Sequence, residues 1–100
     1  MKSLELLTLV RHILTIAIHD CTVQQFKAEV IHREFLKRLN NVNQVVTGYH
    51  QNKKILSKQQ RLVNQVIRDV PHNTKNHYDS LKKALEKAKN SLPSAIDFID

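Results

Sequence analysis

Apolar residues recur at spacings of three and four through most of this chain, which is the period of one face of an α-helix. The first run follows Ser3, a residue type that caps helices, and ends near Ile18. Its stripe consists of Leu6, Val10, Ile13 and Ala17, broadened by Leu7, Leu14 and Ile18. Because this stripe covers most of the circumference, we expect the first helix to lie deepest in the fold.

A second helix is predicted to start at a capping box, in which Thr22 caps the helix and Gln25 occupies its third position. Cys21 and Phe26 flank this start as a hydrophobic staple. We expect the helix to end near Gly48, because glycine readily takes the left-handed conformation that terminates helices. Its apolar positions are Ala28, Ile31, Phe35, Leu39, Val42, Val46 and Tyr49.

The third helix is predicted from a repeat of the capping-box pattern at Ser57 and Gln60. A short apolar face follows, and Pro71 closes the segment because proline cannot continue a helix. That face consists of Leu62, Val63, Val66, Ile67 and Val70.

The fourth helix is predicted to be capped by Asn73 or Thr74 and to end before Pro93. Its stripe consists of Tyr78, Leu81, Leu85, Ala88 and Leu92. Residues 94–100 form a short tail that combines apolar and acidic side chains. We expect this tail to dock partly on the rest of the protein, because its apolar side chains would be costly to leave in water.

Four amphipathic segments with short connections predict an all-α fold, an antiparallel four-helix bundle over residues 1–93 with the C-terminal tail at 94–100. No run of residues alternates with period two, so no sheet is expected. The long second helix should overhang its partners and expose residues 49–54. A second copy of the chain that covers the surplus apolar surface, giving a homodimer, is the alternative.

Cys21 is the only cysteine, which excludes an intrachain disulfide and a cysteine-rich zinc site and makes cytoplasmic residence the default expectation. We expect Cys21 to be a buried residue in preference to a reactive thiol. The apolar stretch from Leu4 to Ile18 falls short of the ~20 residues needed to span a bilayer. Arg11 and His12 also interrupt it. A buried core helix is therefore expected in place of a membrane span.

The chain shows no local signature of a nucleophile, a base and an orienting acid, and it has no glycine-rich phosphate loop. We therefore predict that it is not an enzyme and has no cofactor. His12 and His19 lie on one face but would need a third ligand to hold zinc, so no metal site is predicted. His72 and His77 flank the cap of the fourth helix, where surface hydrogen bonding is expected and a pH-sensitive loop is the alternative.

The formal net charge of +7 comes entirely from residues 35–68, because the basic and acidic side chains of the two flanks cancel. The stretch contains Lys37, Arg38, Lys53, Lys54, Lys58, Arg61 and Arg68, without any Asp or Glu. Such a local field favours an anionic partner, namely nucleic acid, an anionic membrane surface or an acidic protein face. A solvated helix face is the alternative explanation.

Nucleic acid is one candidate partner of this stretch, because amide side chains that contact phosphates and bases accompany its cations. These companions are Gln51, Asn52, Gln59, Gln60, Asn64 and Gln65. The connection between the second and third helices is too long for a helix-turn-helix motif. Nonspecific neutralisation of phosphates is therefore expected, by Lys53, Lys54, Lys58 and Arg61.

The segment Leu36 to Val70, LKRLNNVNQVVTGYHQNKKILSKQQRLVNQVIRDV, combines an apolar helix, Tyr49 and Asn52-Lys53 near its end, a basic turn and a second helix with spaced Leu and Val. It resembles the helical hairpin of the pediocin-like (class IIa) bacteriocin immunity proteins. That resemblance implies a small cytosolic four-helix bundle that recognises a protein partner at the inner membrane face, mainly through the third and fourth helices and the tail.

On this resemblance, Lys82, Lys83 and Phe98 are expected to contact the partner. The sequence thus predicts a non-enzymatic interaction protein, most concretely one of the immunity type. A small basic nucleic-acid-associated regulator is the alternative.

Overall fold

The computed structural model describes residues 1–49 and 52–100, apart from the side chain of Tyr49. The described residues form four α-helices: α1 (Ser3–Val23), α2 (Ala28–Tyr49), α3 (Lys53–Asp69) and α4 (Tyr78–Asn90). Two short 3₁₀ turns complete the fold, η1 (His72–Asn76) between α3 and α4, and η2 (Ile96–Phe98) in the tail. Within this described part there is no strand, so the predicted all-α class is confirmed.

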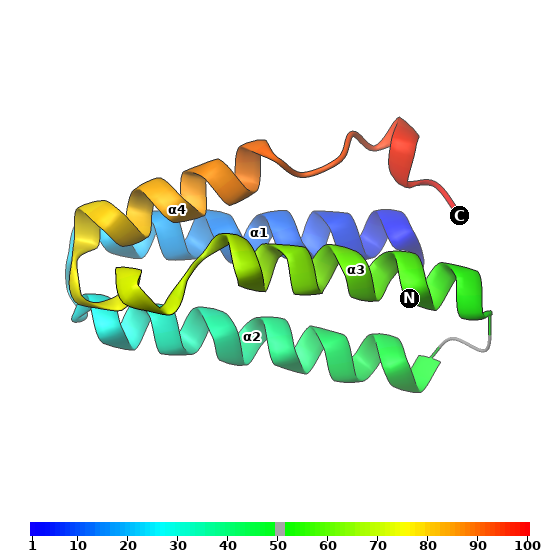
Figure 1. Cartoon of the computed structure of the whole chain (residues 1–100), viewed down its shortest axis with the longest axis horizontal. Helices are drawn as coiled ribbons and strands as arrows, with labels where there is room; N and C mark the ends of the chain where they lie inside the picture. Colours follow the sequence, from blue (N-terminus) through cyan, green and yellow to red (C-terminus); the bar gives the residue numbers. More distant parts are fainter. Residues whose placement is uncertain (50–51) are drawn as a thin grey trace.

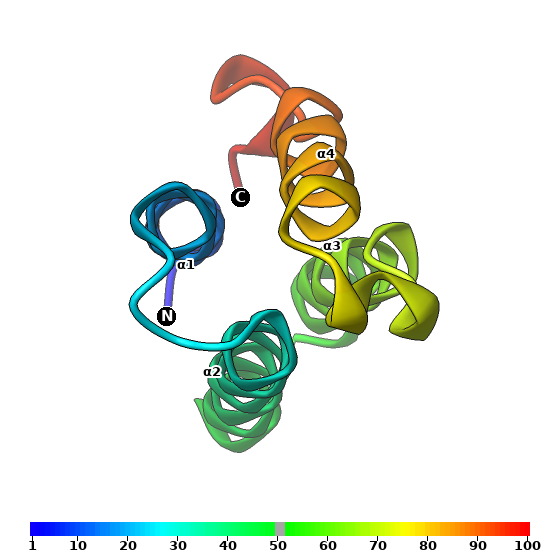
Figure 2. The ribbon, with the colours of Figure 1, turned by 90° about the vertical axis from the view of Figure 1, so that its left-hand side faces the viewer.

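The helices run alternately up and down along the long axis of the molecule, as the chain colours of Figure 1 show. Viewed from its end, the bundle has one helix at each of four corners, and consecutive helices are neighbours (Figure 2). Helix α1 packs against both α2 and α4, and α2 packs against α3. This is the predicted antiparallel four-helix bundle.

The core is built around α1, as its continuous apolar stripe predicts. Leu6, Val10 and Leu14 of this helix are fully buried. Each such side chain contributes about 1.5–3 kcal/mol when it leaves water. The facing helices supply Phe35 and Leu39 from α2, Val63 and Val66 from α3, and Leu81 and Leu85 from α4.

By length and composition alone, α1 could also cross a bilayer, because its 21 residues exceed the apolar stretch visible in the sequence. The helix gains this length by continuing past Ile18 to Val23. In the bundle, eight of its residues are buried, and it contacts helices on two sides. The expectation of a buried core helix is therefore confirmed, although its length was underestimated.

The predicted start of the second helix at Thr22 is wrong. Thr22 belongs to α1, where its hydroxyl donates a hydrogen bond to the carbonyl of Ile18, 3.1 Å away. The helix ends at Val23, and the following residue, Gln24, caps it in the left-handed conformation at φ 60°. The proposed staple is absent as well, because Cys21 is buried whereas Phe26 is exposed. Helix α2 begins only at Ala28.

The predicted end of α2 near Gly48 is confirmed to within one residue, but the left-handed conformation expected of this glycine is not found. Gly48 lies inside the helix, which continues to Tyr49, and no glycine in the described residues has a positive φ. The predicted overhang over residues 49–54 falls partly on His50 and Gln51, which lie outside the described residues. Asn52, Lys53 and Lys54 are exposed, as expected.

Helix α3 starts about one turn earlier than its capping-box pattern predicts. Its cap is Asn52, whose side-chain oxygen accepts hydrogen bonds from the backbone N–H groups of Lys54 (3.0 Å) and Ile55 (3.5 Å). Ser57 lies within the helix and is exposed. The earlier start incorporates Lys53 and Lys54 into the helix.

The start of α4 is also corrected. Thr74 lies in η1 and donates a hydrogen bond to the carbonyl of Pro71 at 2.7 Å, so it closes this turn and does not cap a helix. Asn73 lies in the same turn, and α4 begins at Tyr78. The tail docks partly, as predicted, because Phe98 is 5% exposed whereas Ile96 is 82% exposed.

The two candidate caps of α3 can be distinguished by alanine substitution. We expect Asn52→Ala to lower the free energy of unfolding by about 1 kcal/mol, because two backbone N–H groups lose their acceptor. The matched variant Ser57→Ala should change it by less than about 0.5 kcal/mol, as expected for an exposed position inside a helix. Urea unfolding followed by circular dichroism measures both. A larger effect of Ser57→Ala would contradict this start of α3.

Candidate functional site

The basic side chains of α3 lie on the helix face that points away from the core. Lys53, Lys54, Arg61 and Arg68 are all exposed, and the positions that face inward are apolar except for Gln59. Lys54, Arg61 and Arg68 follow one another at intervals of about two turns, so they line the same side of α3. Part of the predicted basic surface is therefore continuous along one helix.

Lys58 is an exception among these residues, because it contacts the tail. Its ammonium group donates a hydrogen bond to the carbonyl of Ile99 at 2.7 Å and lies 4.7 Å from the centre of the Phe98 ring. An ammonium group over an aromatic face is attracted by the ring electrons. Lys58 and Phe98 were both predicted to bind a partner. The structure brings them together as an anchor of the tail, with Phe98 in the core.

A second anchor joins the tail to the beginning of α1. The Asp100 carboxylate accepts hydrogen bonds from the backbone N–H of Ser3, 3.2 Å from each oxygen, and from the Ser3 hydroxyl. A carboxylate is favoured here because the helix N-terminus carries partial positive charge. The side-chain amide of Gln59 donates to the Ser3 hydroxyl (3.1 Å) and to the Met1 carbonyl (3.2 Å). These contacts link the tail, α1 and α3 at one end of the bundle (Figure 1).

The anchored tail presents two large apolar side chains to solvent. Ile96 is 82% exposed and Ile99 is 57% exposed, on either side of the buried Phe98. Lys54 precedes Lys58 by about one helical turn, so positive charge adjoins these side chains. We call the surface formed by Lys54, Lys58, Ile96 and Ile99 the tail face.

Lys82 and Lys83 do not belong to the tail face. They lie in the second turn of α4, whose start is at the opposite end of the bundle from the tail (Figure 1). Lys83 is exposed, whereas Lys82 is half-buried, and its charge acts on Cys21 near the end of α1. The residues predicted to bind a partner are therefore divided between two ends of the molecule.

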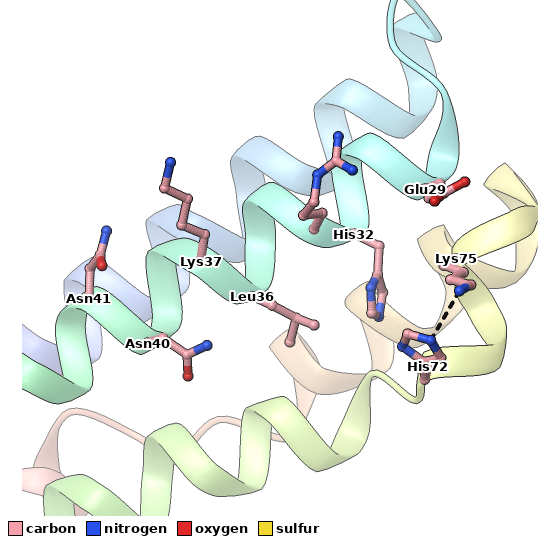
Figure 3. A pocket seen from close by; sticks show the side chains of 9 residues that line it. Glu29, His32, Leu36, Lys37, Asn40, Asn41, His72 and Lys75 are labelled. Atoms are coloured by element: carbon pink, nitrogen blue, oxygen red, sulfur yellow. Dashed lines mark hydrogen bonds between the residues drawn. The ribbon is translucent and has the colours of Figure 1, made fainter.

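An open pocket of about 510 Å³ that was not predicted from the sequence lies between α2 and η1. Its deepest polar side chain is His32, which is only 3% exposed. The ring of His72 meets that of His32 edge to face, with centroids 5.8 Å apart. The ammonium group of Lys75 lies 3.0 Å from Nε2 of His72 (Figure 3). The pocket is lined by Glu29, His32, Arg33, Leu36, Lys37, Asn40, Asn41, His72 and Lys75.

His32 is held in its neutral form. Burial lowers the pKa of His32 below its usual value, and the nearby His72 and Lys75 lower it further, against the opposing effect of a hydrogen bond with the Val70 backbone. Its Nε2 is buried and has no hydrogen-bond partner. His32 is four residues from both Ala28 and Leu36, so it lies beside the apolar stripe of α2. Its burial could have been predicted from this spacing.

His12 and His19 are both exposed on α1. In the part of the chain that the structure describes, no three His, Cys, Asp or Glu side chains lie close enough together to hold a metal ion. No family model, curated protein or solved structure matches the chain. The candidate sites of the chain are therefore the tail face, the basic face of α3 and the pocket of His32.

Cys21 is expected to be unreactive in the folded protein. Burial and the adjacent Asp20 raise the pKa of the Cys21 thiol to about 11, with a smaller opposing effect of Lys82. At pH 8 the thiolate fraction should be roughly a hundredfold below that of an ordinary cysteine, and the side chain is also shielded from reagents. The rate of labelling with a disulfide reagent should therefore rise by more than about a hundredfold in denaturant. Labelling of the native protein at the rate of free glutathione would contradict this burial.

Proposed function

We propose that this chain is a cytoplasmic, non-enzymatic interaction protein of the bacteriocin immunity type, which binds a protein partner at the inner face of the membrane. The tail face is the observation that carries this proposal. Ile96 and Ile99 are exposed although the segment that bears them is anchored at Phe98 and Asp100. Apolar side chains held in place at a surface are typical of binding sites, because ordering them costs little further entropy on association.

The resemblance over residues 36–70 supports the same proposal. This segment forms most of α2 and all of α3, two consecutive antiparallel helices, as expected if it is the helical hairpin of that family. Lys53 and Lys54 are exposed at the start of α3, and Lys54 is part of the tail face. Basic side chains at this position would be attracted to the anionic lipids that surround a partner embedded in the membrane.

A protection assay tests this function directly. We expect expression of the full chain in a sensitive bacterium to raise the inhibitory concentration of at least one member of a panel of pediocin-like bacteriocins. The double variant Ile96→Ser/Ile99→Ser should lose this protection, because it removes the apolar contacts but leaves Phe98 in the core. Val45→Ser is the matched control, since Val45 is an exposed apolar residue of α2 outside the tail face.

Absence of protection against every bacteriocin of the panel, while the folded protein accumulates, would contradict the immunity function. Equal loss of protection in Val45→Ser would instead contradict the assignment to the tail face. Circular dichroism of the purified variants establishes that each retains the helical bundle.

Nucleic-acid binding is the second candidate, and the basic face of α3 favours it. Lys53, Lys54 and Arg61 are exposed on this helix, whereas Lys58 is occupied by the tail. These three cations of the predicted set would neutralise about three phosphates without reading bases, since a phosphate contact carries no sequence information.

For this candidate, we expect duplex binding that weakens with salt on a log-log slope of about −3, measured by fluorescence anisotropy. The triple variant Lys53→Gln/Lys54→Gln/Arg61→Gln should abolish it. Lys82→Gln/Lys83→Gln/Lys87→Gln on α4 changes the net charge equally and should retain it. No binding at low salt, or equal loss in the two triple variants, would exclude a phosphate site on α3.

A further inference from the structure

The pocket between α2 and η1 combines a positively charged lining with an unpaired buried nitrogen. Arg33, Lys37 and Lys75 outnumber the single carboxylate, that of Glu29. His32 belongs to the same lining, and its buried Nε2 has no hydrogen-bond partner. A buried polar atom without a partner destabilises the fold until a ligand or water satisfies it. The pocket therefore has two chemical requirements, an anion and a group that interacts with Nε2.

The unpaired nitrogen requires a hydrogen-bond donor. The hydrogen bond with the Val70 backbone acts to raise the pKa of His32, so the ring is its donor, and the donor atom is the other ring nitrogen because Nε2 has no partner. Donation from that nitrogen to a carbonyl leaves Nε2 with a lone pair, since a neutral imidazole carries one proton. Burial lowers the pKa of His32, which preserves this neutral form. A ligand must therefore bring a proton to Nε2 and negative charge to the surrounding cations.

A phosphate monoester meets both requirements. Its second pKa is about 6, so near neutral pH it readily takes a form with one P–OH donor and other oxygens that accept hydrogen bonds. Carboxylates and sulfate esters carry no such proton at neutral pH. We propose that this pocket binds a small phosphate monoester, with the P–OH donating to Nε2 of His32 and the charged oxygens facing His72 and Lys75.

The side chains around His32 agree with this arrangement. Lys75 and His72 come from η1, and Lys75 has further N–H groups beyond the one directed at His72. In Figure 3, Lys37 and Asn41 extend away from the His32–His72 pair, so Lys37 adds to the field without lying beside the phosphoryl position. No titratable side chain of α3 or α4 lines the pocket, as far as the described residues show.

The pocket also has room for more than a phosphoryl group. Its volume of about 510 Å³ lies in the range of sites for small organic ligands. Leu36 points into it beside His32 and supplies an apolar wall (Figure 3). The organic part of a phosphate monoester can therefore pack against Leu36 while the phosphoryl group lies near η1.

Binding by this arrangement takes up a proton, because the ester is mostly dianionic above pH 7. The affinity should fall about tenfold between pH 7 and pH 8, since the monoanion becomes tenfold rarer in that interval. Sulfate is the control ligand, because it has the same tetrahedral shape and more negative charge than the bound monoanion but no proton to donate. Its affinity should be at least tenfold lower at pH 7 and should change little over this range.

Isothermal titration calorimetry of the full chain with glycerol 3-phosphate and with sulfate tests the proposal. His32→Gln should abolish both the preference for phosphate over sulfate and the pH dependence. Lys75→Gln should lower the affinity for both anions by about tenfold, because one charge-assisted hydrogen bond is lost. Lys83→Gln is the matched control on the exposed face of α4 and should bind as the unaltered chain does.

Equal affinity for sulfate and phosphate, or no saturable binding of either, would overturn the proposal. Because His32 is buried and His32→Gln could unfold the chain, Lys75→Gln provides an independent criterion, since Lys75 lies at the edge of the pocket. Unchanged phosphate binding in folded Lys75→Gln would also overturn it. Co-sedimentation with phosphatidic acid vesicles, against phosphatidylglycerol vesicles, then tells whether the monoester is a lipid headgroup or a soluble molecule, and either source supports the site.

Discussion

The fold depends on burying the apolar stripe of α1. Its apolar stripe is too wide for one neighbour, so α2 and α4 pack against two sides of it, and α3 and the tail contact it as well. Leu6, Val10 and Leu14 are fully buried as a result. A chain of 100 residues can build only one core of this kind, and every other helix contributes its apolar face to the same core. The antiparallel order follows from short connections between consecutive helices.

The same constraint explains why the tail folds back. After α4 ends at Asn90, the first turns of α1 still need cover at the far end of the bundle. Phe98 provides it, and Asp100 adds a carboxylate to the positive end of α1, where Ser3 is fully buried. Two anchors on either side of Ile99 hold the short tail in one conformation. Ile96 and Ile99 remain exposed because a short segment cannot turn every apolar side chain towards one surface.

Periodicity predicted the helices better than local signals predicted their ends. The apolar stripes of α1 and α4 are stabilised by burial of many side chains in the core. A capping box stabilises a helix by only about 1 kcal/mol. At Thr22 this small contribution is outweighed, because continuing α1 buries Cys21. At Ser57 it is outweighed by an extra turn capped at Asn52. The left-handed conformation that was predicted for Gly48 occurs at Gln24, because the chain turns there as it leaves α1.

The candidate sites were harder to predict, because each joins residues distant in the chain. The pairing of Lys58 with Phe98 and of His32 with His72 arises only when the helices pack. Packing also divides the basic stretch of residues 35–68. Lys37 lies beside the pocket of His32, Arg38 lies near Glu34 and Asp20 on another side of α2, and the cations of α3 face outward. The net charge of this stretch is therefore distributed over several surfaces.

This division limits what the charge alone can explain. A field spread over different sides of a bundle attracts anions generally, but recognition requires side chains that converge. Convergence occurs at two places in the described structure. At the tail face, positive charge adjoins exposed isoleucine side chains, which suits a partner with an apolar surface. At the pocket, positive charge surrounds a buried imidazole nitrogen, which suits a small anion that carries a proton. The two surfaces therefore differ in the chemistry that they can recognise.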